Sequence, residues 1–203
     1  MSDVDLVKRC RLGDSEALAE LFVRYQDRLF KLAYLVARSH QDAQDILQET
    51  FIRVIRAIHT YDETKGTFET WLYAIAVNLA RDHLRRQKRP FLPWHLLDEN
   101  KHMAGRAAQP ESLSLEREWQ QTIWEAVNSL EEKQRITVIL RYYLDLSCAE
   151  IAKVLSCPEG TIHSRLYYAR LILEQKLGEE SVQLAWFMAQ ASFPKARGKL
   201  SGG

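Results

Sequence analysis

The segment from Leu146 to Arg170 constrains the fold of this chain most, because it predicts two short helices joined by a tight turn. Ser147 is followed three residues later by Glu150, which is the pattern of a capping box that satisfies the free N–H groups of a first helical turn. Ser156-Cys157-Pro158 ends the first helix, and Pro158 suits the first position of the second because no N–H is needed there. The segment therefore predicts a helical hairpin.

The second helix of this hairpin has an apolar face and a polar face. Ile162, Leu166, Ala169 and Leu173 recur at helical spacing and are expected to face inward. The side chains left facing outward are Thr161, His163, Ser164, Arg165, Tyr167, Tyr168 and Arg170. A helix that enters a DNA major groove needs such a face. The alternative is an ordinary hairpin whose polar face meets water.

The length, charge and apolar content of the chain exclude several classes of protein. The chain has 203 residues, 46% of them hydrophobic, which is enough for one medium domain or two small ones. The formal net charge of +1 confines any nucleic-acid surface to a local patch. Apolar runs are shorter than the roughly 20 residues that span a bilayer. The N-terminus lacks the basic region followed by an apolar region that marks a signal peptide. We therefore expect a cytoplasmic protein with no membrane span.

Motifs of catalysis are absent from the sequence. It contains no Gly-rich phosphate loop, no HExxH and no GxSxG. Cys10, Cys148 and Cys157 form no CxxC pair and no disulfide framework. We expect no catalytic residue, no metal site and no cofactor. A redox switch at Cys148 and Cys157 is the alternative to inert, buried thiols.

The N-terminal part, residues 1–89, predicts a domain of three helices. Asp14 or Ser15 would cap the first, and Ser39 with Asp42 would cap the second. The third helix is expected from about Thr70 to Arg86. The predicted inward residues are Leu18, Leu21, Phe22, Tyr25, Leu29, Leu32, Ala33 and Val36 in the first helix, Ala43, Ile46, Leu47, Phe51, Val54, Ile55 and Ile58 in the second, and Leu72, Ile75, Ala76, Leu79 and His83 in the third.

The helical pattern stops and resumes further along the chain. Residues 90–112 contain prolines and scattered apolar side chains, so they predict a linker that either docks on a partner or packs against its own domains. Residues 113–178 predict a second domain of four helices that includes the hairpin, with a capping box at Ser129 and Glu132 and a terminator at Gly178. Residues 179–203 form an apolar and then polar extension of unknown role. The predicted fold class is all-α: two small helical domains joined by an extended linker, the second containing a helix-turn-helix.

Three segments together resemble one family. "EIAKVLSCPEGTIHSRLYYAR" resembles the promoter-binding helix-turn-helix of extracytoplasmic-function (ECF) sigma factors of bacterial RNA polymerase, and "DAQDILQETFIRVIRAI" resembles their polymerase-binding segment. "GTFETWLYAIAVNLARD" is similar to the family's promoter-opening segment. The resemblance covers roughly Val4 to Leu177 and implies the minimal two-domain type of sigma factor.

The resemblance assigns a polymerase-binding surface to the predicted second helix. Its residues are Asp42, Asp45, Gln48, Glu49 and Phe51. Acidic and amide groups exposed there would pair with arginines of the partner. From the residues alone, such a charged stripe is also what a solvated helix face looks like.

The resemblance assigns minus-ten recognition and melting to the loop from Tyr61 to Phe68 and to the third helix. The implied contacts are Tyr61, Lys65, Phe68, Asn78, Asp82, Arg85 and Arg86. An aromatic-bearing loop could stack an unpaired base, and a basic helix end could follow the phosphates. Trp71 is expected in the core instead.

The resemblance assigns the minus-thirty-five element to the Thr161–Arg170 helix, with bases or sugars facing His163, Ser164, Tyr167 and Tyr168. Arg165 and Arg170 are expected at phosphates or in internal pairs. His163 and Tyr168 stand where the family often has lysine or arginine, and Ser156 replaces the usual turn glycine. A tyrosine cannot make the bidentate guanine contact of an arginine. The usual family promoter sequence is therefore not expected to transfer unchanged.

The leading hypothesis is a non-enzymatic initiation factor whose partners are core RNA polymerase, promoter DNA and an anti-sigma factor. A free-standing repressor or activator would need only the second domain, and it leaves the acidic helix unexplained. A nucleic-acid enzyme lacks the metal-ligand or acid–base cluster that it needs.

Overall fold

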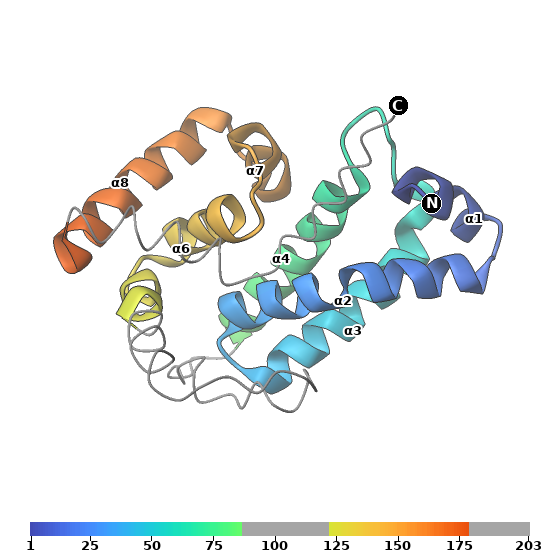
Figure 1. The fold of residues 1–203 in the computed structure, drawn as a ribbon, viewed down its shortest axis with the longest axis horizontal. Helices are drawn as coiled ribbons and strands as arrows, with labels where there is room; N and C mark the ends of the chain where they lie inside the picture. Colours follow the sequence, from blue (N-terminus) through green and yellow to red (C-terminus); the bar gives the residue numbers. More distant parts are fainter. Residues whose placement is uncertain (87–121, 179–203) are drawn as a thin grey trace, which may run out of the picture. The chain divides into compact units, whose positions relative to one another are not determined.

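The computed structural model describes residues 1–86 and 122–178, and these residues form helices and loops with no strand among them (Figure 1). Their contacts divide them into two compact units, one of residues 1–86 and 146–164 and the other of residues 122–145 and 165–178. The all-α prediction is confirmed. The predicted linker, residues 90–112, and the C-terminal extension, residues 179–203, lie outside the described residues.

The first unit begins with α1 (Asp3–Arg11), a helix that the three-helix prediction missed. Ser2 and Asp5 form a capping box at its start, and only Leu6 and Val7 are buried. Two buried side chains in nine residues leave too weak a periodic signal to predict a helix. Contacts to the next helix hold α1 in place, including an Arg24–Asp3 ion pair at 2.5 Å. The prediction of three helices was therefore wrong.

Three longer helices complete the bundle: α2 (Ser15–Ala37), α3 (His40–Ala57) and α4 (Phe68–Arg86), with the short η1 (Ile58–Thr60) after α3. Asp14 caps α2 by accepting from Glu16 N at 2.9 Å and Ala17 N at 3.2 Å. Ser39 caps α3 through Asp42 N at 3.2 Å. Both caps were predicted, and they explain why the chain turns at these two points.

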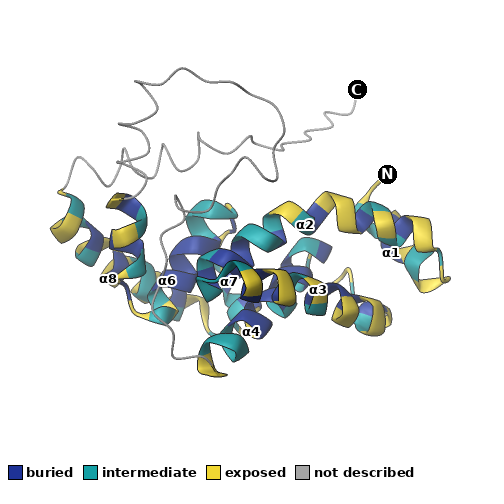
Figure 2. Cartoon of the chain, turned by 90° about the horizontal axis from the view of Figure 1, so that it is seen from below, coloured by how far each residue is buried: buried dark blue, intermediate teal, exposed yellow. Residues whose placement is uncertain are grey.

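The core of this bundle lies where the inner faces of α2, α3 and α4 meet (Figure 2). Leu29, Leu32, Ile46 and Leu72 are at most 1% exposed. Phe22 and Ile55 were predicted inward but are 38% and 53% exposed, so these two assignments were wrong. Each comes directly after a buried residue in the chain. Because successive residues of an α-helix are rotated by about 100°, each side chain lies at the edge of the apolar face.

The second unit contains a helical segment at residues 122–128, α6 (Glu132–Val138) and the π-helical turn η4 (Ile139–Tyr143). It also contains the part of α8 (Glu159–Leu177) from Arg165 onward. A hydrophobic core joins these segments, made of Ile123, Ala126, Val127, Leu130, Val138, Ala169 and Leu173. Gly178 ends α8 at a φ of 76° with its N–H bonded to Glu174 O at 2.8 Å, as predicted.

The capping box predicted at Ser129 and Glu132 is absent. The Ser129 hydroxyl donates to Ala126 O at 2.6 Å, and its backbone N–H bonds back to Glu125 and Ala126. Ser129 therefore closes the preceding helix. The cap position of α6 is Glu131, two residues later, and no side-chain hydrogen bond is made there.

The predicted hairpin is formed by α7 (Cys148–Leu155) and the start of α8. Ser147 and Glu150 make the reciprocal capping box, with Glu150 N to Ser147 Oγ at 3.2 Å and Ser147 N to Glu150 Oε2 at 2.8 Å. Ser156 turns the chain in the left-handed region at a φ of 50°, without a glycine. α8 begins at Glu159, one residue after Pro158.

Candidate nucleic-acid and protein interfaces

The acidic face of α3 is narrower than the sequence suggested. Asp45 and Gln48 are exposed, and Glu49 is half-buried and ion-paired with Arg53 at 3.1 Å. Asp42 and Phe51 are buried, at 8% and 7% exposure. The Phe51 ring packs on Phe22, with ring centroids 4.7 Å apart. The surface offered to a partner therefore centres on Asp45 and Gln48, and Phe51 supports it from below.

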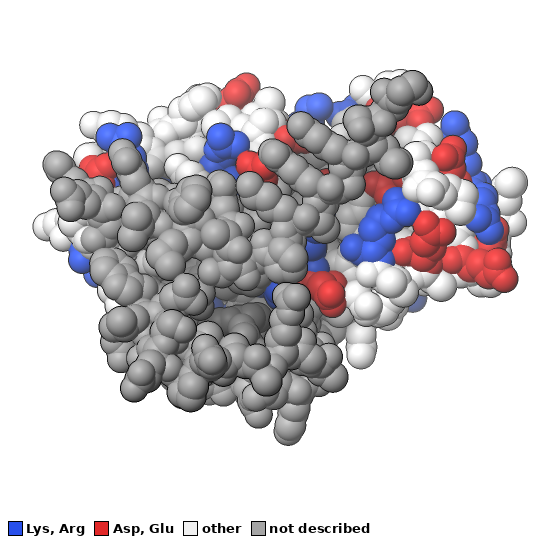
Figure 3. Space-filling view, viewed as in Figure 1, with Lys and Arg blue, Asp and Glu red and all other residues white. Residues whose placement is uncertain are grey.

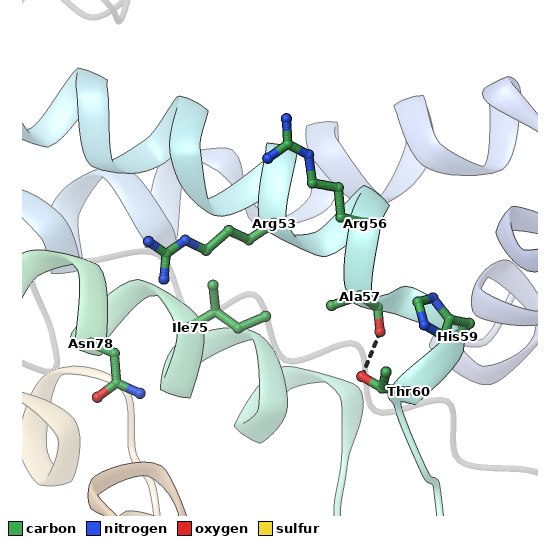
Figure 4. Close-up of a pocket in the computed structure, with 7 residues that line it drawn as sticks. All are labelled: Arg53, Arg56, Ala57, His59, Thr60, Ile75 and Asn78. Atoms are coloured by element: carbon green, nitrogen blue, oxygen red, sulfur yellow. Dashed lines mark hydrogen bonds between the residues drawn. The ribbon is translucent and has the colours of Figure 1, made fainter.

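Beside this face, α3, η1 and α4 enclose a pocket of about 450 Å³ that the sequence did not predict as a unit (Figure 4). Its lining consists of Arg53, Arg56, Ala57, His59, Thr60, Ile75 and Asn78. The lining combines two arginine side chains with the apolar side chains of Ala57 and Ile75, which suit a phosphate and a base respectively. Arg53, Arg56 and His59 recur every three residues, which was the signal in the sequence for this pocket.

The aromatic residues of the loop between η1 and α4 lie beneath it. Tyr61 and Phe68 are 6% and 2% exposed, and each ring centroid lies 5.7 Å from that of Trp71 and 5.7 Å from the other. Neither ring offers a free face for stacking, contrary to the sequence-based expectation, and Trp71 is only half-buried. Lys65 is exposed, with its ammonium 3.4 Å from Asp62. The surface of the loop is thus polar above an aromatic core.

Arg11 holds this loop from α1, a role that the sequence did not reveal. Its Nε donates to Ile58 O at 3.2 Å, and its Nη2 donates to Tyr61 O. These partners lie about 50 positions away in the chain, so no local pattern could pair them. Arg11 is therefore a positioning residue for the loop.

The C-terminal half of α4 presents the other predicted minus-ten residues. Asn78, Arg85 and Arg86 are exposed, whereas Asp82 is half-buried and lies 3.7 Å from Arg85. Lys88 and Arg89, which follow Arg86 closely in the sequence, lie outside the described residues. On the face drawn in Figure 3, basic and acidic atoms are interspersed where described residues are visible. A phosphate contact here would be local to the end of α4.

The polar face of α8 has the predicted orientation. Ile162, Ala169 and Leu173 are at most 1% exposed, and Leu166 is half-buried. The outward set divides into two groups: His163, Ser164, Tyr167, Tyr168 and Arg170 are exposed, and Thr161 and Arg165 are half-buried. The exposed side chains are those that a bound molecule would meet.

Several of these polar groups have partners within α8. Arg170 Nε lies 2.8 Å from Glu174 Oε1, and His163 Nε2 lies 3.6 Å from Glu159 Oε1. Ser164 Oγ donates to Gly160 O at 3.0 Å. Tyr167 and Tyr168 form an edge-to-face pair with ring centroids 5.5 Å apart, and both are 57% exposed. The two phenol rings therefore dominate the accessible surface of this face.

Comparison with known proteins places both parts of the chain in one group. Residues 21–90 match Sigma-70 region 2, and residues 120–173 match Sigma-70, region 4. The chain is 36% identical over 185 residues to the ECF RNA polymerase sigma-E factor of Escherichia coli K12, covering 87% of this chain and 95% of that protein. It is 34% identical over 181 residues to the RNA polymerase sigma-H factor of Pseudomonas aeruginosa, with 86% and 93% covered.

Two solved structures share the fold. One is CnrH in complex with the cytosolic domain of CnrY, with a TM-score of 0.62, 24% identity, and 85% of this chain and 95% of that chain covered. The other is the sigma factor RpoE in complex with the anti-sigma factor NepR from Bartonella quintana, with a TM-score of 0.59, 24% identity, and 79% and 96% covered.

A helical protein with sigma regions 2 and 4 in this order is a sigma factor rather than an enzyme. This chain belongs to the ECF RNA polymerase sigma factors, which bind core polymerase and promoter DNA and direct the polymerase to promoters. None of the helices described here is long and apolar enough to cross a membrane. The same residues contain no cluster of three or more His, Cys, Asp or Glu side chains that could hold a metal ion.

Proposed function

We propose that three separate surfaces of this chain bind core polymerase, the minus-ten element and the minus-thirty-five element during initiation. Asp45 and Gln48, with Glu49 beside them, bind core polymerase. The η1–α4 loop and the end of α4 bind the minus-ten element, and the exposed face of α8 binds the minus-thirty-five element. The observation that carries the proposal is that α8 buries its apolar residues on one side and exposes polar residues on the other. This accessible polar face lies in a segment that matches sigma region 4.

The burial pattern refines the role of each predicted residue. Asp42 and Phe51 support the polymerase-binding face, since both side chains are buried. Tyr61 and Phe68 shape the minus-ten loop, and Lys65 and Asn78 meet the DNA. The pocket beside Asn78 accepts the displaced strand, with Arg53 and Arg56 at its phosphates. Arg85 and Arg86, at the end of α4, contact phosphates of the DNA backbone.

The domain boundaries and partners complete the proposal. Residues 1–89 act as the region 2 domain and residues 113–178 as the region 4 domain, with 90–112 as the linker and 179–203 as an extension. The matched ranges 21–90 and 120–173 support this division. An anti-sigma factor regulates the chain; the RpoE structure that shares this fold is a complex with the anti-sigma factor NepR. The protein acts in the cytoplasm, where RNA polymerase is found.

Run-off transcription with purified core polymerase and a library of genomic fragments tests the proposal. The wild-type protein should produce transcripts with discrete starts. Replacing Asp45 and Gln48 together by Ala should reduce these transcripts and core binding at least about tenfold, because truncating charged and polar contacts at a protein interface costs about 2–5 kcal/mol.

A matched control removes an acid and an amide elsewhere: Glu16→Ala with Gln175→Ala, both exposed positions outside the proposed surfaces. This variant should transcribe like the wild type. Circular dichroism checks that both variants are folded. Specific retention of DNA by the protein alone, without any core-dependent transcript, would instead indicate a free-standing regulator.

A further inference from the structure

The exposed residues of α8 between His163 and Arg170 carry little free positive charge. The Arg170 guanidinium is paired with Glu174 at 2.8 Å, and Arg165 is half-buried. Bidentate recognition of guanine O6 and N7 requires an arginine or lysine that projects toward the base edge. A run of guanines is therefore a poor match to this face.

The two tyrosines supply a different chemistry. Tyr167 and Tyr168 are each 57% exposed. The edge-to-face packing of the rings, at 5.5 Å, fixes each against the other and limits the entropy lost on binding. Together they form a preformed apolar surface with two polar tips.

In the major groove, only thymine offers an apolar group at the base edge, its C5-methyl. An aromatic ring packs well against a methyl group, and the phenol hydroxyl can donate to a phosphate or a base acceptor beside it. The Ser164 hydroxyl, one turn earlier on α8, donates to Gly160 O at 3.0 Å. This side chain is small and uncharged, so it leaves room for a base edge beside the tyrosines and adds no charge there.

We propose that the Tyr167–Tyr168 pair is the specificity-determining element of α8 and that it recognises thymine methyl groups in an A·T-containing block of the minus-thirty-five element. This inference rests on the proposed function, in which α8 enters the major groove. It goes further because it names the bases that the helix selects.

The experiment uses holoenzyme, made from core polymerase and the full chain, on a promoter found by run-off transcription whose minus-thirty-five block is randomised. Sequencing of transcribed templates should show thymine, on either strand, enriched at two neighbouring positions. Replacing those thymines by deoxyuridine removes only the methyl groups. Initiation should then fall about fourfold for each methyl lost, the change that one buried methyl group produces in an equilibrium constant.

Three variants separate the contributions. Tyr168→Phe should keep the thymine preference and its sensitivity to deoxyuridine. Tyr168→Arg should move the preference at one position to guanine and remove the effect of deoxyuridine there. Gln175→Arg adds the same charge at another exposed position of α8 and should behave like the wild type.

Two outcomes would overturn the inference in distinguishable ways. If wild-type holoenzyme selects guanines and ignores deoxyuridine, α8 still reads the element, but the tyrosines do not read methyl groups. If the randomised block shows no selection and transcription persists with Tyr167→Ala and Tyr168→Ala together, the proposed function of α8 fails as well. Thermal unfolding of each variant confirms that the helix is intact.

Discussion

At the scale of single residues, a buried phenol and an arginine of α2 share one carboxylate of α4. Tyr73 is fully buried, and its hydroxyl donates to Glu69 Oε1 at 2.7 Å. Arg28 of α2 lies 2.8 Å from the same carboxylate oxygen. Burial, followed by the charge of Glu69, raises the pKa of Tyr73 well above its ordinary value of 10.0. The hydroxyl therefore remains protonated and serves as a donor throughout the neutral range.

Replacing Tyr73 by Phe should lower the free energy of unfolding by about 1 kcal/mol, because one buried hydrogen bond is lost and the ring is kept. Urea unfolding at pH 7 measures this change. Since the folded pKa is raised, the contribution is complete below pH 10 and is lost at higher pH, so the advantage of the wild type should shrink as the pH rises above 10. Tyr167→Phe, whose hydroxyl is exposed, should leave stability unchanged; an equal loss in both variants would contradict the role of Tyr73.

At the scale of elements, caps with a local signature were predictable and contacts between distant segments were not. Asp14, Ser39 and the Ser147–Glu150 box are all seen, because each bond joins residues no more than three positions apart. The same pattern at Ser129 gave a wrong prediction, because the Ser129 hydroxyl is bonded to Ala126 O at the end of the preceding helix. α1 was missed because its order depends on contacts with α2, such as Arg24 with Asp3.

The two serines give a direct comparison of a real cap with a false one. Ser147→Ala removes the side-chain acceptor at the start of α7 and should destabilise the chain by about 1 kcal/mol. It should weaken promoter binding by holoenzyme while binding to core polymerase is kept. Ser129→Ala should cost less, because it removes only the hydroxyl's bond to Ala126 O and leaves the start of α6 unchanged. Chemical unfolding of both variants measures the difference, and equal losses would mean that the assignment of caps is wrong.

At the scale of the whole molecule, the sequence predicted the helices better than it predicted which of their side chains are accessible. Tyr61, Phe68 and Phe51 were predicted to contact partners, yet their rings are buried. Arg53, Arg56 and His59 share one face of α3 and η1, but they line a pocket only because α4 supplies Ile75 and Asn78. Periodicity gives the face of one helix, whereas a pocket requires the packing of several. Side-chain roles at a shared surface are therefore the least predictable part of the chain.

The balance of charge over the chain makes a prediction about salt. The formal net charge is only +1, so the dependence of promoter binding on salt must come from local contacts and not from the overall charge. Arg85 and Arg86 are exposed at the end of α4. If they contact phosphates of the opened strand, replacing both by Ala should reduce the slope of log affinity against log salt for holoenzyme by about 1–1.5, at about 0.7 per single-strand phosphate. Lys133→Ala with Lys176→Ala removes the same charge from exposed positions outside the proposed surfaces and should keep the wild-type slope. An equal reduction in both variants would mean that long-range charge, and not contact at α4, governs binding.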